Sequence, residues 1–197
     1  MNLFAFKLFL LLLLINFSAH AKNLEKDELL KIKGYLKNIN NFQAEFTQIN
    51  NDESINKGRI LVKKPKKFRF EYFDQPIIIA SNGQYIIYYD KELEQSNYLD
   101  SNYLSQILGG GNVFFNKNTE IISAELIGDN YKITIKSLAK DFDDKVILFF
   151  SKKDLKLLSF TIIRADLSEI SLVLNNLIIN QRDLPDNLFE IKDSRFR

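Results

Sequence analysis

Apolar residues recur at every second position through much of the first half of this chain. Phe42, Ala44 and Phe46 alternate with polar residues, and the stretch 58–90 repeats the alternation in several short runs. A period of two points successive side chains to opposite faces of a β-strand. Short strands with a buried face therefore dominate this region, and their apolar surface exceeds what two hairpins need for their own packing.

A proline and a basic run interrupt these strands. A strand predicted over about 57–64 stops at Pro65, which can donate no hydrogen bond to a sheet, and the next strand covers about 67–73. Around the proline, the residues at 63–67 read Lys-Lys-Pro-Lys-Lys. We interpret Lys63, Lys66 and Lys67 as a solvated turn that also protects a sheet edge from unwanted pairing. Contact with anionic lipid headgroups is the alternative.

The Asn-Gly pair at 82–83 is a strong signal for a two-residue hairpin turn. Pairing across such a turn sets Ile78 opposite Ile87 and Ala80 opposite Tyr85. These four side chains would then share one face of an antiparallel sheet.

A helix precedes the strands, and more strands follow them. Apolar residues recur at three- and four-residue intervals between residues 24 and 39 and predict an amphipathic helix, with Asn23 as its N-cap. We expect a short helix over 102–108 and a glycine connector at 109–111. The remaining expected elements are strands at 121–127, 131–137, 145–150, 155–165 and 169–180, and a helical turn at 184–189.

The first 21 residues have the pattern of a secretory signal. Lys7 precedes a short apolar run, and Ala19-His20-Ala21 supplies small residues for cleavage. The apolar run is too short to span a bilayer as a stable helix. We therefore expect an exported mature chain, residues 22–197, that folds as one domain.

The residue types exclude several chemistries. His20, inside the predicted signal, is the only histidine, and the chain has no cysteine. Imidazole bases, Ser-His-Asp triads, thiolate nucleophiles and the usual zinc sites each need one of these residues. We therefore expect no enzymatic activity, no metal site and no cofactor. An exported hydrolase that uses carboxylates stays open as the enzymatic alternative, although no motif localises its catalytic pair.

The formal net charge of +2 does not indicate nucleic-acid binding.

Three segments, in their order and spacing, resemble the LolA family of periplasmic carriers of outer-membrane lipoproteins. They are NFQAEFTQ from Asn41, GRILVKKPKKFRFEY from Gly58, and SNGQYIIYYD from Ser81 with LEQ from Leu93. The resemblance covers roughly the first half of the mature chain. It implies a mainly β (α+β) fold, in which an open, curved antiparallel half-barrel sheet carries a helical lid over a hydrophobic cavity.

The resemblance also implies a function without catalysis. Such a carrier accepts lipoproteins that an ABC transporter releases from the inner membrane, shields their acyl chains, and delivers them to the outer membrane. Its partners would be acylated lipoproteins, the transporter and, where present, an outer-membrane acceptor of the LolB type. The chain would act in the periplasm as a monomer. A half-barrel regulator that senses lipids or lipoproteins is the alternative, although such proteins usually carry a second domain.

The candidate acyl-binding residues alternate along the predicted strands. They are Phe42, Phe46, Phe68, Phe70, Tyr72, Ile78, Ile87 and Tyr89. Ordinary core packing is the competing interpretation for all of them. The resemblance favours the cavity for Phe68 and Phe70, which match the family's aromatic residues near the cavity mouth.

Two positions depart from the family pattern. Lys64 stands where the family usually has an arginine before the proline, and the resemblance implies that this residue holds the lid through hydrogen bonds to backbone carbonyls. A lysine lacks the planar fork of arginine donors, so we expect a lid that opens easily. Phe70 stands where the family usually has tryptophan, which keeps an apolar lining but removes the indole donor.

Overall fold

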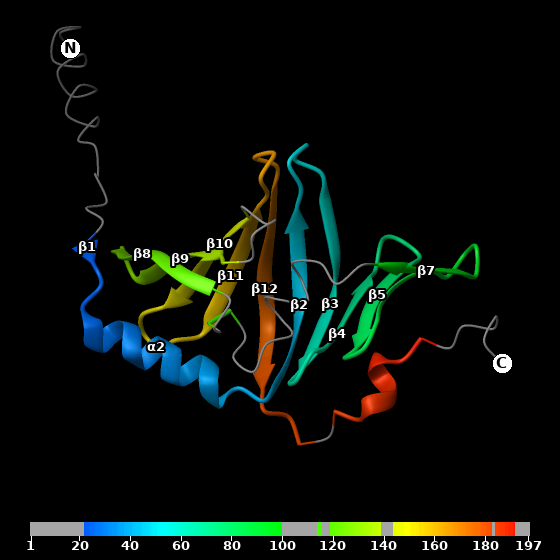
Figure 1. Cartoon of the computed structure of the whole chain (residues 1–197), viewed down its shortest axis with the longest axis horizontal. Helices are drawn as coiled ribbons and strands as arrows, with labels where there is room; N and C mark the ends of the chain where they lie inside the picture. The colour runs from blue at the N-terminus through cyan, green and yellow to red at the C-terminus, as the bar shows by residue number, and fades with distance from the viewer. Residues whose placement is uncertain (1–21, 100–113, 116–118, 139–143, 183, 192–197) are drawn as a thin grey trace, which may run out of the picture.

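A single twelve-stranded antiparallel sheet dominates the computed structural model. The structure describes residues 22–99, 114–115, 119–138, 144–182 and 184–191. Within them, the strand order is β1-β8-β9-β10-β11-β12-β2-β3-β4-β5-β6-β7, and the two end strands do not pair with each other (Figure 1). The predicted mainly β, open and curved antiparallel sheet is therefore confirmed. The predicted signal at 1–21, helix at 102–108 and connector at 109–111 lie outside the described residues.

The helices and strands follow the chain in an order close to the predicted one. Their bounds are β1 (Lys22–Asn23), α2 (Lys26–Asn38), β2 (Asn41–Ile49), β3 (Ile55–Lys63), β4 (Lys67–Tyr72), β5 (Ile77–Asn82), β6 (Ile86–Asp90), β7 (Gln95–Leu99), β8 (Thr119–Ile127), β9 (Asn130–Ser137), β10 (Lys145–Ser151), β11 (Leu157–Ile163), β12 (Glu169–Ile179) and the 3₁₀ helix η1 (Asp186–Phe189). The sequence did not predict β1 or β7. Within the described residues, no helix is both long and apolar enough to cross a membrane.

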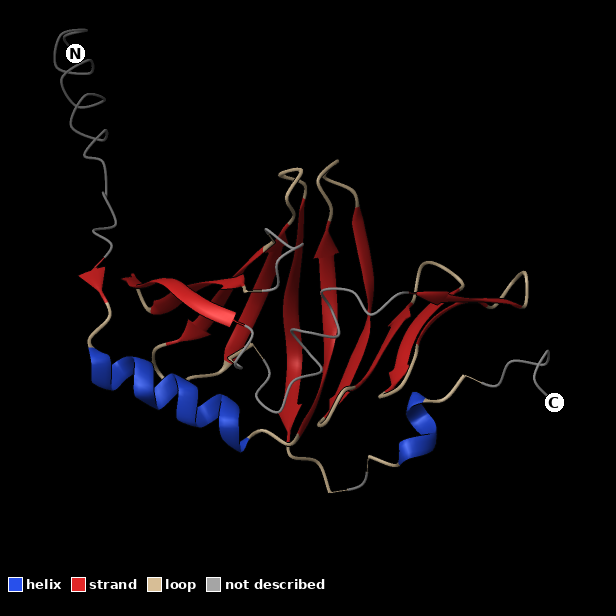
Figure 2. Cartoon of the chain, viewed as in Figure 1, coloured by secondary structure: helices blue, strands red, loops and turns tan. Residues whose placement is uncertain are grey.

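Helix α2 lies across one half of the sheet (Figure 2). Its buried residues Ile32 and Leu36 belong to the same hydrophobic core as the β9–β12 side chains. The predicted N-cap is wrong, because Asn23 lies in β1 and pairs with Glu125. The helix starts after Glu25, whose N–H donates to the Glu28 carboxylate at 3.4 Å.

The pairing register defines the two faces of the sheet. Phe42 lies opposite Val62, which lies opposite Phe68. We call the face that carries these three side chains the inner face, because their side chains join the core that also contains Ile32 of α2. The other side is the outer face. The alternation predicted for β2 is thus confirmed, with Phe42, Ala44 and Phe46 all buried.

The β5–β6 hairpin is longer than predicted. Ile78 pairs with Tyr89, and Ala80 pairs with Ile87, two positions away from the predicted register. The Asn82 side-chain oxygen accepts hydrogen bonds from the N–H groups of Gln84 and Tyr85, at 3.0 and 3.1 Å, and this stabilises a wider turn. A shift by two keeps every side chain on its predicted face, because the period of a strand is two.

Candidate functional site

An aromatic cluster occupies the inner face of β2 and β4. The Phe46 ring lies 5.8 Å from the Phe70 ring and 5.4 Å from the Tyr72 ring, and Phe68 lies 6.0 Å from Phe70. All three pairs are edge-to-face, the geometry that the ring quadrupoles favour. Phe46, Phe68 and Phe70 are almost fully buried. The structure therefore brings together four of the predicted acyl-binding residues.

Gly58 makes room for this cluster. It lies opposite Phe46 on one side and Tyr72 on the other. A Cβ atom at this position would lie 2.5 Å from Cζ of Phe46 and would also collide with the backbone oxygen of Glu71. The absence of a side chain thus lets the Phe46 ring lie against the sheet.

Tyr72 adds a polar group at the border of the cluster. Its hydroxyl donates to the Gln48 side chain at 2.8 Å. Burial raises the pKa of the Tyr72 hydroxyl above its usual value, so the group stays neutral. The cluster accordingly presents apolar surface without a charge.

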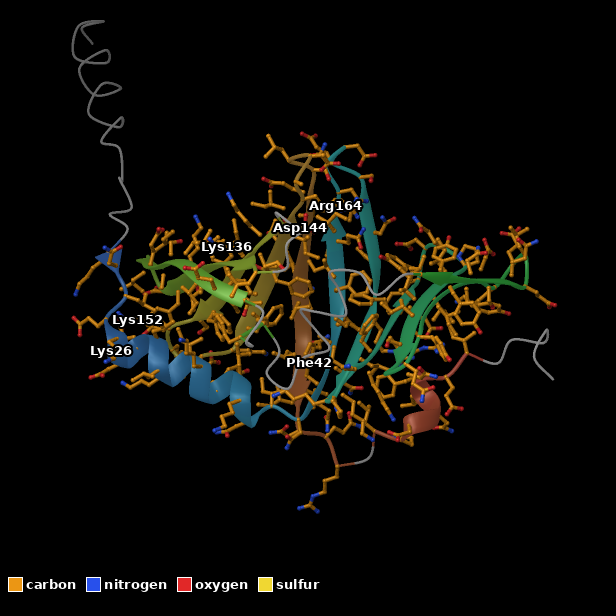
Figure 3. The ribbon with its side chains drawn as sticks, in the orientation of Figure 1. Lys26, Phe42, Lys136, Asp144, Lys152 and Arg164 are labelled. Carbon is orange, nitrogen blue, oxygen red and sulfur yellow. The ribbon has the colours of Figure 1, made fainter. Side chains whose placement is uncertain are left out.

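Phe42, labelled in Figure 3, lines a second apolar space beneath α2. This space has a volume of only about 10 Å³, and its lining includes Leu36, Ile39, Phe114 and Leu157. The Phe114 ring is fully buried and lies 5.6 Å from the Phe160 ring. Such a volume holds about one water molecule at most. Within the described residues, this space therefore leaves no room for an acyl chain.

Lys64 connects the sheet to the end of α2. Its ammonium group donates to the backbone oxygen of Leu36 at 3.0 Å and to that of Lys37 at 3.2 Å. These carbonyls belong to the last turn of the helix, where the usual donors four residues further along are missing. The Leu36 oxygen also accepts from the N–H of Ile39 at 3.3 Å. Partial burial lowers the pKa of the Lys64 ammonium. The contacts are of the kind that the resemblance implied, and the role in holding a lid stays a prediction.

Asn180, which directly follows β12, supports the same helix end. Its amide donates to the backbone oxygen of Asn38 at 2.9 Å, and its side-chain oxygen accepts from the N–H of Asn40 at 2.7 Å. The sequence analysis did not identify Asn180, because the residue lies 140 positions away from its partner.

Three predicted site residues lie on the other side of the sheet. Phe70 pairs with Ile79, so Ile79 lies on the inner face and Ile78 on the outer face. Ile87 and Tyr89 share the outer face with Ile78 through their pairing. The eight candidate residues therefore do not share one face of the sheet. Apolar residues follow one another without a polar partner at 77–80 and 86–89, so alternation could not reveal the face.

The basic hairpin between β3 and β4 contacts the C-terminal segment. Lys63 and Lys67 lie 2.6 and 2.7 Å from the Asp186 carboxylate of η1. Hydrogen bonds from these two lysines lower the pKa of Asp186 to about 2. The interpretation as a solvated turn at a sheet edge is therefore wrong for Lys63 and Lys67, because β3 and β4 lie inside the sheet and these lysines bind η1. Lys66 is exposed, as expected.

Comparisons with known proteins agree with this architecture. The family described as outer membrane lipoprotein carrier protein LolA matches residues 37–192. The uncharacterized protein RP864 of Rickettsia prowazekii (strain Madrid E) is 32% identical over 124 residues, which are 62% of this chain and 57% of that protein. The chain thus spans little more than half the length of that relative.

Comparison with solved structures gives matches at low sequence identity, and the likeness in fold rests on the first of them. A DUF1329 family protein from Desulfovibrio piger ATCC 29098 has a TM-score of 0.51 and 10% identity, over 83% of this chain and 95% of that chain. The LolA superfamily protein NE2245 from Nitrosomonas europaea has a TM-score of 0.45 and 13% identity, over 82% of this chain and 97% of that chain.

Proposed function

Because the chain belongs to the LolA family, we propose that it carries the acyl chains of lipoproteins across the periplasm. In this proposal an inner-membrane ABC transporter loads the carrier, and the outer membrane or an acceptor in it receives the cargo. The chain acts as a carrier and performs no catalytic step. The observation that supports it best is the buried aromatic cluster of the inner face, in one core with a helix that Lys64 ties to the sheet.

The hydrophobic effect supplies the reason for such a carrier. Each CH₂ group of an acyl chain costs about 0.8 kcal/mol when it is exposed to water. Phe46, Phe68 and Phe70 would replace the water around the acyl chain with apolar contacts. The carrier must also release its cargo, so these contacts have to compete with another partner for the same surface.

Helix α2 is such a partner on the part of the inner face that Phe42 and Phe114 line. The space beneath it measures only about 10 Å³, so an acyl chain enters only when the helix or Phe114 moves. Loading then exchanges contacts of Ile32 and Leu36 with the core for contacts with the acyl chain. Since Lys64 makes only two hydrogen bonds to the helix end, we expect the energy of this exchange to stay small enough for reversible opening.

A single fluorescent probe tests the proposal. The chain has no tryptophan, so the Phe70→Trp variant contains one indole, located in the aromatic cluster. We would titrate it with a triacylated lipopeptide whose acyl chains carry bromine, which quenches indole fluorescence on contact. We expect saturable quenching and a soluble one-to-one complex in native mass spectrometry. The same peptide without acyl chains should leave the fluorescence unchanged.

The Phe73→Trp variant is the matched control. Phe73 follows β4 directly and is 60% exposed. Equal quenching in both variants, or no soluble complex, would contradict the carrier proposal. In cells, depletion of the protein followed by separation of the two membranes distinguishes carriage from sensing. A carrier predicts lipoproteins retained in the inner membrane, whereas a regulator leaves their distribution unchanged.

A further inference from the structure

A groove runs along the flank of α2, between the helix and the start of β8. Its volume is about 460 Å³, within the range of about 300 to 1,000 Å³ that is typical of small-molecule sites. Its lining includes Leu30, Lys33, Gly34, Lys37, Phe115 and Ile121.

The groove is separate from the closed space under the helix. Leu36 and Phe114 line that closed space, whereas Leu30 and Phe115 line the groove. Leu30 is 54% exposed, although it is a large apolar residue. The neighbouring residues Phe114 and Phe115 thus serve two different spaces, and the groove leaves apolar surface in contact with water.

Two lysines supply positive charge to the lining of this groove. Lys33 and Lys37 are four residues apart and therefore lie on the same side of the helix. The groove lining contains no carboxylate. Among the ion pairs of the described residues, none involves either of these two lysines. The Lys33 ammonium lies 6.0 Å from the centre of the Phe115 ring, so charge and apolar surface meet in one place.

Gly34 supplies an independent indication of an occupant. A glycine inside a helix is destabilising relative to alanine. Apart from the helix's own backbone, a Cβ atom at Gly34 would meet no atom within 4 Å, so among the described residues no neighbour requires the glycine. The residue lines the groove between the two lysines and leaves the helix backbone accessible there.

We propose that this groove binds an acyl chain that carries a single anionic head group. Lys33 and Lys37 would contact the head group. The acyl chain of the ligand would lie over Gly34 and against Leu30 and Phe115. The inference does not rest on the proposed carrier function, because it concerns a site outside the aromatic cluster.

A pair of ligands that differ in one charge tests this inference. The probes are 11-(dansylamino)undecanoic acid and its methyl ester, whose fluorescence rises on transfer to an apolar site. We expect the acid to bind with a Kd at least about tenfold lower than that of the ester, since hydrogen bonds to charged groups are worth more than neutral ones. In the double variant Lys33→Gln, Lys37→Gln this preference should disappear. Equal affinities for acid and ester in the wild-type protein would overturn the inference.

A control with the same change of net charge is available on the same helix. Lys26 and Lys31 are exposed and do not line the groove. The double variant Lys26→Gln, Lys31→Gln should keep the preference for the acid. If it loses the preference as well, the effect is a general attraction by the charge of the helix and the groove is not the site.

Gly34→Ala separates binding from stability. The substitution should raise the midpoint of thermal unfolding, since alanine favours the helix, and weaken binding of the acid several-fold, since the methyl group enters the groove. Unchanged affinity for the acid would contradict a chain lying over Gly34. Quenching of the Phe70→Trp reporter by the lipopeptide provides a separate readout. The experiments therefore distinguish a wrong groove proposal from a wrong carrier proposal.

Discussion

The Nζ atom of Lys64 lies 3.0 Å from the backbone oxygen of Leu36 and joins the β3–β4 hairpin to the last turn of α2. A second bond, to Lys37, involves the same ammonium group. A cation at the C-terminal end of a helix also interacts favourably with the helix dipole. One side chain thus supplies both hydrogen bonds and charge to the end of the helix that covers the core.

Replacement of Lys64 by methionine should loosen this end of the helix. We expect the variant to lose about 1–2 kcal/mol of stability, because two carbonyls lose a charged donor and the dipole loses a cation. Hydrogen exchange of the α2 amides should be faster in the variant than in the wild-type protein, whereas exchange of the β9–β11 amides should change little. Equal protection of α2 in both proteins would contradict a holding role for Lys64.

Lys64→Arg tests whether the lysine makes the lid easy to open. The guanidinium offers a rigid fork of donors, so we expect tighter closure and slower exchange of lipopeptide. The measurement is the affinity and the release rate of the triacylated lipopeptide, with Lys66→Arg as a control in the same hairpin. The hypothesis fails if Lys64→Arg changes neither quantity.

The ion pairs of Asp186 should make the stability of the folded protein depend on pH in the acidic range. Its pKa is lowered from 3.8 to about 2. A carboxylate with a depressed pKa stabilises the folded state above its unfolded pKa, and this contribution is lost as the pH falls through the folded value. The difference in Tm between the wild-type protein and Asp186→Asn should therefore be constant near neutral pH and shrink between about pH 4 and about pH 2.

Salt supplies a second test of the same contact. Asp186 and the two lysines are partly exposed, so added salt should screen them. The Tm difference should decrease with ionic strength. If the Tm difference between the wild-type protein and Asp186→Asn changes with neither pH nor salt, Asp186 stabilises η1 by means other than charge.

Gly58→Ala should disrupt the aromatic cluster. The new methyl group would collide with the Phe46 ring and with the Glu71 backbone, and the backbone cannot move aside as a flexible side chain can. We expect a loss of about 1–3 kcal/mol, measured by urea unfolding. Gly34→Ala is the matched control, since its methyl group meets nothing in the protein and should stabilise the helix. A stable Gly58→Ala variant would contradict the close contact between Phe46 and Gly58.

Phe114→Ala should enlarge the closed space under α2. The substitution removes a fully buried ring and should cost about 3–5 kcal/mol. Apolar cavities of this kind bind apolar ligands, so the triacylated lipopeptide should raise the Tm of this variant more than that of the wild-type protein. Phe189→Ala removes an equally buried ring from the separate cluster with Leu61 on the outer face, and the lipopeptide should not rescue it. Equal rescue of both variants would contradict an acyl site beneath the helix.

Local patterns predicted most helices and strands. The alternation of Phe42, Ala44 and Phe46 identified β2 and its buried face, and Pro65 marked the end of β3. β7 was missed because Gln95–Leu99 is mostly polar and forms a strand by pairing with β6. The hairpin register was wrong by two because the Asn82 side chain stabilises a longer turn than the Asn-Gly pair predicts.

The candidate site was predicted in part. Phe46, Phe68, Phe70 and Tyr72 form a cluster, since each lies on a strand whose alternation is clear. Ile78, Ile87 and Tyr89 lie on the outer face, because strands with apolar residues on both faces carry no local sign of orientation. The groove beside α2 was not foreseen, since it needs Phe115 and the helix to meet across a long stretch of chain.

The sequence by itself determined most of the strand segments, that a helix precedes them, and that the chain has no cysteine and a single histidine, His20. Only the tertiary structure decided which side of β5 and β6 faces the core, and what the lysines around Pro65 contact. The physical reason is the range of the interactions. Alternation reports the burial of one strand, whereas Lys63 and Asp186 are 123 residues apart and meet only through the folded sheet.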